Sequence, residues 1–217
     1  MAGRQRLRVG GCGLVAAAAL LACLGLGVLV AVDATRGLDD GISEAILASH
    51  TTTLGRVAAT WETAGDLIPW ILISWLVGLA LFVSGRRLAA VWFFAAITAD
   101  VVAALIKIAF TLPRPPGGDL LDLFGGPSYA YPSGHVARTV VLLGLLAWVG
   151  LQEVPRLRRP FVAPSFALLV VVGVALMGIA RIGAGQHWPS DVLGGALLGV
   201  AWLAFVMWLD RRVRGHP

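Results

Sequence analysis

The run LVAAAALLACLGLGVLVAV, from Leu14 to Val32, decides the fold class, because its 19 residues carry no charge. At about 1.5 Å per residue, a helix of this length nearly crosses the roughly 30 Å hydrocarbon core of a bilayer. Similar runs follow along the chain, which is 58% hydrophobic and only 13% charged. A soluble domain has about 25% charged residues. The sequence therefore predicts an all-α, polytopic integral membrane protein.

The apolar runs predict six transmembrane helices in a single domain that covers residues 1–217. The predicted spans are 12–32, 67–83, 88–110, 135–152, 161–180 and 191–209. Arginines before the first run would also fit a cleaved signal peptide. The run is longer than the roughly 7–15 apolar residues of such signals, so a membrane anchor is favoured.

The arginines indicate how the helices are oriented in the membrane. Eleven of them lie in the N-terminal tail, the turns at 84–87 and 153–160, and the C-terminal tail, whereas four lie in the other three loops. Because basic loops stay in the cytoplasm, we expect a plasma-membrane protein with both termini cytoplasmic. The loops 33–66, 111–134 and 181–190 are then extracytoplasmic. No basic stretch is interleaved with aromatic residues, so the net charge of +5 does not indicate a nucleic-acid partner.

Two further patterns concern packing rather than chemistry. In the first loop, Ile42, Ala45 and Ile46 follow helical spacing, which predicts a short helix at the membrane surface. In the last span, the spacing Gly195-x3-Gly199 is typical of two helices in close contact.

Lys107 is the only lysine among the 17 lysines and arginines of the chain. It lies near the end of the third span, where an ionisable group is costly and is often functional. A lysine at this depth can also simply extend its ammonium group to the membrane surface. Arg114 follows seven residues later, in the second extracytoplasmic loop.

The segment Pro132-Ser133-Gly134-His135 precedes the fourth span. Serine before a helix is an ordinary N-cap, and Pro-Ser-Gly is ordinary turn chemistry. The same arrangement also directs free backbone N–H groups and a hydroxyl at whatever lies above the helix start. It therefore predicts an anion site with an imidazole beside it.

A third group, Arg181-x5-His187-x3-Asp191, lies in the last extracytoplasmic loop and at the start of the sixth span. If His187 and Asp191 share a helix, they lie on the same face, and the carboxylate can hold one ring nitrogen. The other nitrogen is then available as a nucleophile or base. The alternative is a capping histidine beside an interfacial Trp188.

All three groups fall on the same predicted side of the membrane. Together they supply three cations, a helix start, two imidazoles and one carboxylate. Phosphoryl transfer depends on such positioning and charge neutralisation. No cluster of carboxylates offers a metal site, so we expect neither a metal nor another cofactor.

The order and spacing of these motifs resemble the three-part signature of the type 2 phosphatidic acid phosphatase superfamily, over residues 88–209. That superfamily includes lipid phosphate phosphatases and vanadium haloperoxidases. The resemblance implies that His187 attacks phosphorus, Asp191 orients His187, and His135 protonates the leaving oxygen.

The phosphoryl oxygens would be held, by the same resemblance, by Lys107, Arg114, Arg181, Ser133 and the Gly134 backbone. One position departs from the family pattern. Serine usually precedes the arginine of the third motif, whereas this chain has Ala180. The hydroxyl that the family pattern places near the phosphate is therefore absent at this position.

The expected activity is hydrolysis of a lipid phosphate or an isoprenyl diphosphate through a phosphohistidine. The motifs do not identify the lipid: undecaprenyl diphosphate, phosphatidylglycerol phosphate and phosphatidic acid all present a phosphate at headgroup level. The alternative is a transporter or binding protein that holds an anionic lipid without hydrolysing it, for which Ala180 is the supporting feature. A soluble haloperoxidase fits poorly, since most of this chain is membrane span.

Overall fold

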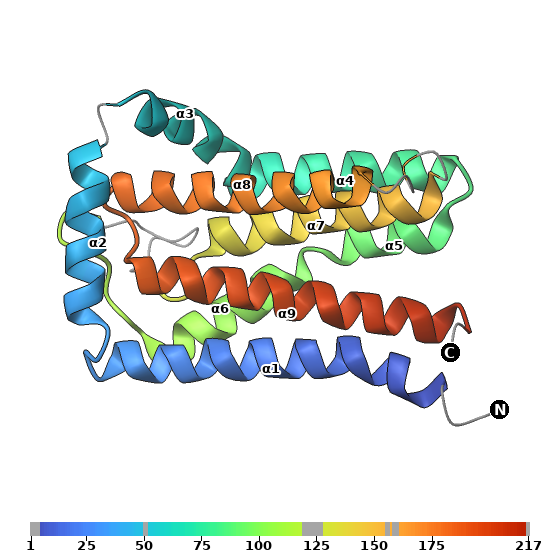
Figure 1. Cartoon of the computed structure of the whole chain (residues 1–217), viewed down its shortest axis with the longest axis horizontal. Coiled ribbons are helices and arrows are strands. Elements are labelled where there is room, and N and C mark those ends of the chain that lie inside the picture. Colours follow the sequence, from blue (N-terminus) through green and yellow to red (C-terminus); the bar gives the residue numbers. More distant parts are fainter. Residues whose placement is uncertain (1–4, 50–51, 119–127, 155–156, 158–160, 216–217) are drawn as a thin grey trace.

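The computed structural model describes residues 5–49, 52–118, 128–154, 157 and 161–215, and every regular element in these ranges is a helix. The long helices form a bundle, and α2 lies across one end of it (Figure 1). The elements are α1 (Gln5–Ala31), α2 (Arg36–Ser49), α3 (Thr53–Glu62), the 3-10 helix η1 (Thr63–Gly65), α4 (Leu67–Val83), α5 (Arg87–Ala95), α6 (Thr98–Phe110), α7 (Gly134–Glu153), α8 (Val162–Gly183) and α9 (Pro189–Val213).

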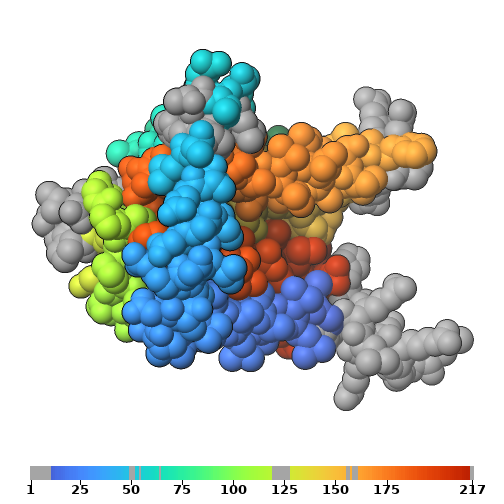
Figure 2. Space-filling model, turned by 60° about the vertical axis from the view of Figure 1, so that its left-hand side comes forward, coloured from blue at the N-terminus to red at the C-terminus, as the bar shows by residue number. Residues whose placement is uncertain are grey.

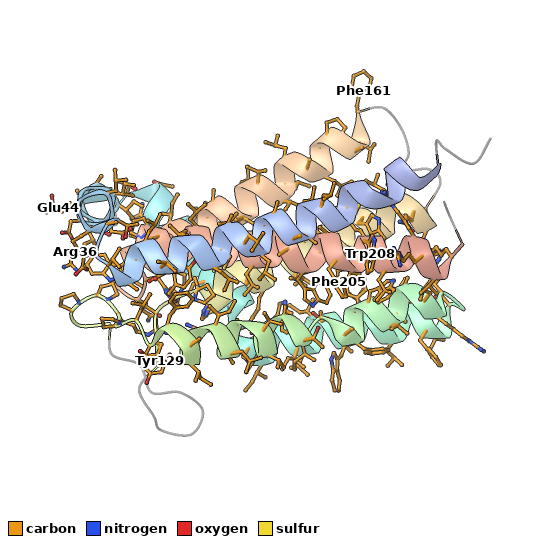
Figure 3. The ribbon with its side chains drawn as sticks, turned by 90° about the horizontal axis from the view of Figure 1, so that it is seen from below. Arg36, Glu44, Tyr129, Phe161, Phe205 and Trp208 are labelled. Carbon is orange, nitrogen blue, oxygen red and sulfur yellow. The ribbon has the colours of Figure 1, made fainter. Side chains whose placement is uncertain are left out.

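The surface of the bundle is apolar, as a lipid environment requires. Leu14, Ile108 and Phe161 are 71%, 66% and 83% exposed, and Phe161 projects away from the start of α8 (Figure 3). Within the described ranges, five spans are long and apolar enough to cross a membrane, or six if the bent pair of α3 and α4 counts as one. The prediction of a polytopic helical membrane protein is therefore confirmed.

The third predicted span, 88–110, is not one straight helix. It is divided into α5 and α6, with Ala96 and Ile97 between them. The hydroxyl of Thr98 donates to the carbonyl of Ala95 at 2.7 Å and accepts the Trp202 indole N–H at 2.8 Å. A threonine hydroxyl that bonds to the backbone offers an alternative to the regular helix, and this contact lies at the interruption.

The two ends of the bundle differ in character. The start of α1, the end of α9 and the turn between α4 and α5 lie at one end, and α2 lies at the other (Figure 1). This arrangement matches the sorting of loops predicted from the arginines. Of the clustered arginines, Arg4, Arg156, Arg158 and Arg159 lie outside the described residues.

The helix predicted around Ile42 is present as α2, and it covers one end of the bundle (Figure 2). Asp39 of α2 is buried and accepts hydrogen bonds from the Ser190 backbone N–H and hydroxyl, both at 2.8 Å. The guanidinium of Arg36 lies 4.5 Å from the centre of the Trp188 ring. Helix α2 is thereby fastened to the start of α9.

The glycines of α9 allow α7 to pack against it closely. A Cβ at Gly195 would lie 2.3 Å from the carbonyl oxygen of Ser133, and one at Gly199 would lie 2.6 Å from Cβ of Val140. The close packing predicted from their spacing is confirmed. The Ser133 backbone N–H donates to the Asp191 carbonyl at 2.9 Å, so the second and third motifs meet at the end of the bundle beneath α2.

Candidate active site

His187 and Asp191 are adjacent, but they do not share a helix. Pro189 is the first residue of α9, so His187 precedes the helix. A proline at the first helical position is favourable because its missing N–H is not needed there. Asp191 instead acts as the third residue of the helix, and its Oδ2 accepts the Trp188 backbone N–H at 2.8 Å. The two residues therefore do not share a helix face, but their side chains still face each other, as the carboxylate–imidazole pairing requires.

The His187 imidazole is held on both sides. Nδ1 lies 3.4 Å from Oδ2 of Asp191, and Nε2 lies 3.3 Å from Nη1 of Arg114. The ring is 2% exposed, and Asp191 is fully buried. Burial, and then the charges of Lys107, Arg114 and Arg181, lower the pKa of His187 well below its usual value. The imidazole is consequently neutral at physiological pH.

Arg114 lies in the loop after α6 and connects that loop to the segment before α9. Its Nε donates to the carbonyl of Ser128 at 2.9 Å, and its Nη2 donates to the Ser128 hydroxyl at 2.8 Å. Its Nη1 donates to the carbonyl of Gln186 at 2.6 Å. Burial, and then the charge of Arg181, disfavour the charged form of the Arg114 guanidinium, so the pKa of Arg114 is lowered. Arg114 is thus a cation held by three hydrogen bonds to oxygen atoms and placed beside a neutral imidazole.

Lys107 lies in the last turn of α6, as the span boundaries predict. Its ammonium donates to the carbonyl of Tyr129, and to that of Ala130 at 3.1 Å. These carbonyls belong to the segment that leads into the second motif. Lys107 therefore joins the first motif to the second, in addition to acting on His187 through its charge.

The second motif provides an unpaired hydroxyl at a helix start. Ser133 is the N-cap of α7 and is fully buried, yet its side chain does not cap the helix. Among the described residues, its Oγ has no hydrogen-bond partner. Gly134 follows as the first residue of α7, with room for a Cβ 3.4 Å from Nη2 of Arg138. A buried polar atom without a partner usually indicates a missing ligand or water.

Arg181 is almost completely buried, at 3% exposed, near the end of α8. Its Nη1 donates to Oε1 of Glu62, and its Nη2 donates to Oε1 of Gln186. Its Nε has no partner within the part of the chain that the structure describes. This nitrogen is therefore a second buried donor that is available to a ligand.

His135, on the first turn of α7, has a partner that the sequence did not predict. Its Nε2 lies 2.9 Å from Oδ1 of Asp66, which comes from the segment between α3 and α4. Glu62 is the other acidic residue that was missed. Both lie in the predicted loop 33–66, with no periodicity or motif spacing that connects them to the histidines or arginines.

Ala180 lies near the end of α8, next to Arg181, and faces α3. It helps to line a cavity of about 20 Å³, together with Glu62, Ala59 and Gly183. A volume of this size is sufficient for one water molecule or a hydroxyl group. The hydroxyl of a serine at this position would therefore lie near the carboxylate that holds Arg181.

The donor groups favour an anion over a metal ion. Across the described ranges, no three side chains of the histidine, cysteine, aspartate and glutamate types are grouped so as to hold a metal. The predicted residues gather instead at one end of the bundle, where α6 and α8 end and α7 and α9 begin. The arrangement can bind a group with several oxygens and place it next to Nε2 of His187.

Two proteins that are similar in sequence to this chain carry the same name. Phosphatidylglycerophosphatase B of Bacillus subtilis (strain 168) is 24% identical over 195 residues, which are 87% of this chain and 91% of that protein. The Escherichia coli (strain K12) protein of the same name is 36% identical over 90 residues, which are 40% of this chain and 31% of that protein.

A solved structure shares the fold. It is the crystal structure of the first transmembrane PAP2 type phosphatidylglycerolphosphate phosphatase from Bacillus subtilis, with a TM-score of 0.76 and 22% identity. The alignment covers 91% of this chain and 96% of that one. A sequence model of the PAP2 superfamily matches residues 88–214, which contain all three motifs. The resemblance to the type 2 phosphatidic acid phosphatases is thus confirmed, and this multi-pass membrane protein belongs to the PAP2 superfamily.

Proposed function

We propose that this protein is a membrane phosphatase that hydrolyses a lipid phosphate or an isoprenyl diphosphate through a phosphohistidine on His187. One observation carries the proposal: a neutral, buried imidazole lies among three cations and two buried donors that have no partner among the described residues. The cations are Lys107, Arg114 and Arg181. These donors are Oγ of Ser133 and Nε of Arg181. Superfamily membership supports the same activity.

The first chemical step is attack on phosphorus. Nδ1 of His187 faces the Asp191 carboxylate, so Nδ1 carries the proton and the lone pair lies on Nε2. Nε2 forms a bond to phosphorus while the bond from phosphorus to the lipid oxygen breaks. The lipid oxygen leaves with that electron pair and takes a proton from His135. Asp191 stabilises the positive charge that develops on the His187 ring.

The second step releases phosphate. His135, now neutral, accepts a proton from water, and the water oxygen attacks phosphorus. The bond between phosphorus and Nε2 breaks, and its electron pair returns to His187. In both steps Lys107, Arg114 and Arg181 balance the charge on the equatorial oxygens, with the Ser133 hydroxyl and the Gly134 backbone as further donors. These fixed cations serve where other phosphatases use a metal ion, so we propose a metal-independent reaction.

The protein would lie in the plasma membrane. Its site would face the extracytoplasmic side, and both termini would lie in the cytoplasm. The asymmetry of the arginines supports this orientation. The names of the relatives make phosphatidylglycerophosphate the first substrate to test. Phosphatidic acid and undecaprenyl diphosphate are the necessary comparisons.

The experiment uses the whole chain purified in detergent. Phosphate release from each of the three lipids is measured with and without EDTA, and with His187→Gln as the control. We expect release from at least one lipid, unchanged by EDTA and lost in the variant. Binding of the lipids without any release of phosphate would favour the alternative, a protein that holds or transports an anionic lipid. Ala180, in place of the serine common in the family, is the feature that favours that alternative.

A further inference from the structure

The bend between α3 and α4 reaches the basic groups of the site from outside the family-matched region. Residues 62–66 precede the matched residues 88–214. Glu62 pairs with Arg181, and the Gly65 carbonyl accepts Nη1 of Arg138 at 2.7 Å. Asp66 contacts His135 as well. Two groups on this short segment thus contact the second and third motifs, and a third contacts Arg138, one helical turn after His135 on α7.

The bend is seated tightly against the histidine. A Cβ at Gly65 would lie 2.7 Å from Cε of Met177 and 3.1 Å from Cδ2 of His135. A side chain at Gly65 would therefore displace the end of Met177 and press on the imidazole, so the bend packs closely against His135 and against α8. The position of Asp66 relative to His135 is therefore set by packing as well as by the polar contact.

Asp66 occupies a position where it would be expected to serve its own helix. It is the N-cap residue of α4, and aspartate is among the preferred residues there because its carboxylate accepts backbone N–H groups. The Asp66 side chain makes no capping hydrogen bond. Its Oδ1 contacts Nε2 of His135, 2.9 Å away. The carboxylate is therefore hydrogen-bonded to the His135 imidazole and not to a backbone N–H group at the start of α4.

We infer that Asp66 is a positioning residue for His135, and that residues 62–66 form a fourth part of the active site. The inference rests on the proposed function, in which His135 is the proton donor. With Nε2–H directed at Asp66, Nδ1 is the nitrogen that gives its proton to the leaving lipid oxygen and later accepts one from water. His135 and Asp66 then repeat, for proton transfer, the arrangement of His187 and Asp191.

The kinetic test compares two leaving groups. Asp66→Asn keeps an acceptor oxygen but removes the charge, so kcat on the lipid phosphate should fall about tenfold or more, with KM little changed. On p-nitrophenyl phosphate, whose leaving group needs little protonation, the loss should be under about threefold. Asp66→Glu, which restores the charge, should have a higher kcat on the lipid phosphate than Asp66→Asn. In a protein that already carries His135→Ala, adding Asp66→Asn should cause no further loss of kcat.

Asp40→Asn is the matched control. Asp40 is a carboxylate on α2 that is exposed to a similar degree, 46% against 53% for Asp66, and it pairs with Arg36. Asp40→Asn should leave the hydrolysis of the lipid phosphate and of p-nitrophenyl phosphate unchanged. Equal losses for Asp66→Asn on the two phosphates, or a full additional loss in the His135→Ala background, would overturn the inference.

A second readout does not depend on activity. In protein with 15N-labelled histidine, assigned with His135→Gln, the His135 ring should show the proton on Nε2, and Asp66→Ala should change that signal. An unchanged signal would overturn the inference. If the unmutated protein hydrolyses neither phosphate, the proposed function fails, and this signal alone then decides whether Asp66 positions the ring.

Discussion

Nη1 of Arg114 lies 3.3 Å from Nε2 of His187. A guanidinium has only donors, so the imidazole presents its lone pair toward the cation. In the proposed reaction this lone pair attacks phosphorus, and the same guanidinium holds an oxygen of the group under attack. The contact between the two residues therefore marks where the phosphoryl group would enter.

Replacing Arg114 by lysine keeps the charge but removes the fork of donors that reaches Ser128, Gln186 and His187 together. A hydrogen bond to a charged group contributes about 1.5–3 kcal/mol. We therefore expect kcat/KM for the lipid phosphate to fall roughly 10- to 150-fold. Arg56→Lys, at an exposed arginine on α3, is the control and should have no effect. A loss of under about threefold for Arg114→Lys would show that a point charge suffices.

The pKa of His187 predicts how stability depends on pH. Burial and neighbouring cations keep the folded-state pKa well below the usual value, whereas the unfolded chain has a pKa of about 6.5. As the pH falls through 6.5, the unfolded state gains a proton that the folded state does not, and stability is lost. Between pH 7.5 and 5.5 this amounts to about 1.4 kcal/mol. The Tm of the unmutated protein should fall more over this range than that of His187→Gln, and equal falls would contradict the lowered pKa.

Ala180→Ser tests the departure from the family pattern. The cavity of about 20 Å³ beside Ala180 has space for a hydroxyl near Glu62. One added hydrogen bond is worth about 0.5–1.5 kcal/mol, so phosphate release should stay equal or rise modestly. A collapse of activity with the protein still folded would mean that the position cannot accept a hydroxyl, and that the alignment of the third motif is wrong.

The gathering of the three motifs could be predicted from the sequence because each one adjoins the end of an apolar span. Span ends on the same side of a membrane must share a layer, so Lys107, Ser133 and Arg181 could be placed together without a structure. The glycines of α9 then reduce the distance between α7 and α9. Their spacing was also readable in advance.

Other features depend on tertiary contacts that have no local signal. Glu62 and Asp66 come from a bend whose packing against α8 sets their direction, and nothing in their spacing connects them to His135. At the interruption of the third span, the Thr98 hydroxyl accepts the indole N–H of Trp202, which is more than a hundred residues away. The helix start at Pro189 did have a local signal, since proline favours the first helical position, and it excludes His187 from the helix.

Membrane orientation is tested by labelling single cysteines in intact cells, in a chain without Cys12 and Cys23. Glu44 points outward from α2 (Figure 3), and Ser84 is exposed in the turn between α4 and α5. The arginine asymmetry predicts that Glu44→Cys reacts with a membrane-impermeant thiol reagent and that Ser84→Cys does not. The opposite pattern would put the site on the cytoplasmic side.

The central claim is that His187 carries the phosphoryl group. Rapid mixing of the purified protein with a lipid phosphate labelled with 32P on its terminal phosphate, followed by alkaline quenching, measures this directly. Phosphohistidine survives alkali, and His135→Ala removes the proposed donor without removing the nucleophile. We predict a labelled protein in the unmutated chain, with the label on His187, and none in His187→Ala. In His135→Ala the label should appear more slowly, because the leaving lipid oxygen then lacks its proton donor. A labelled His187→Ala protein, or phosphate release from it at the unmutated rate, would contradict the account.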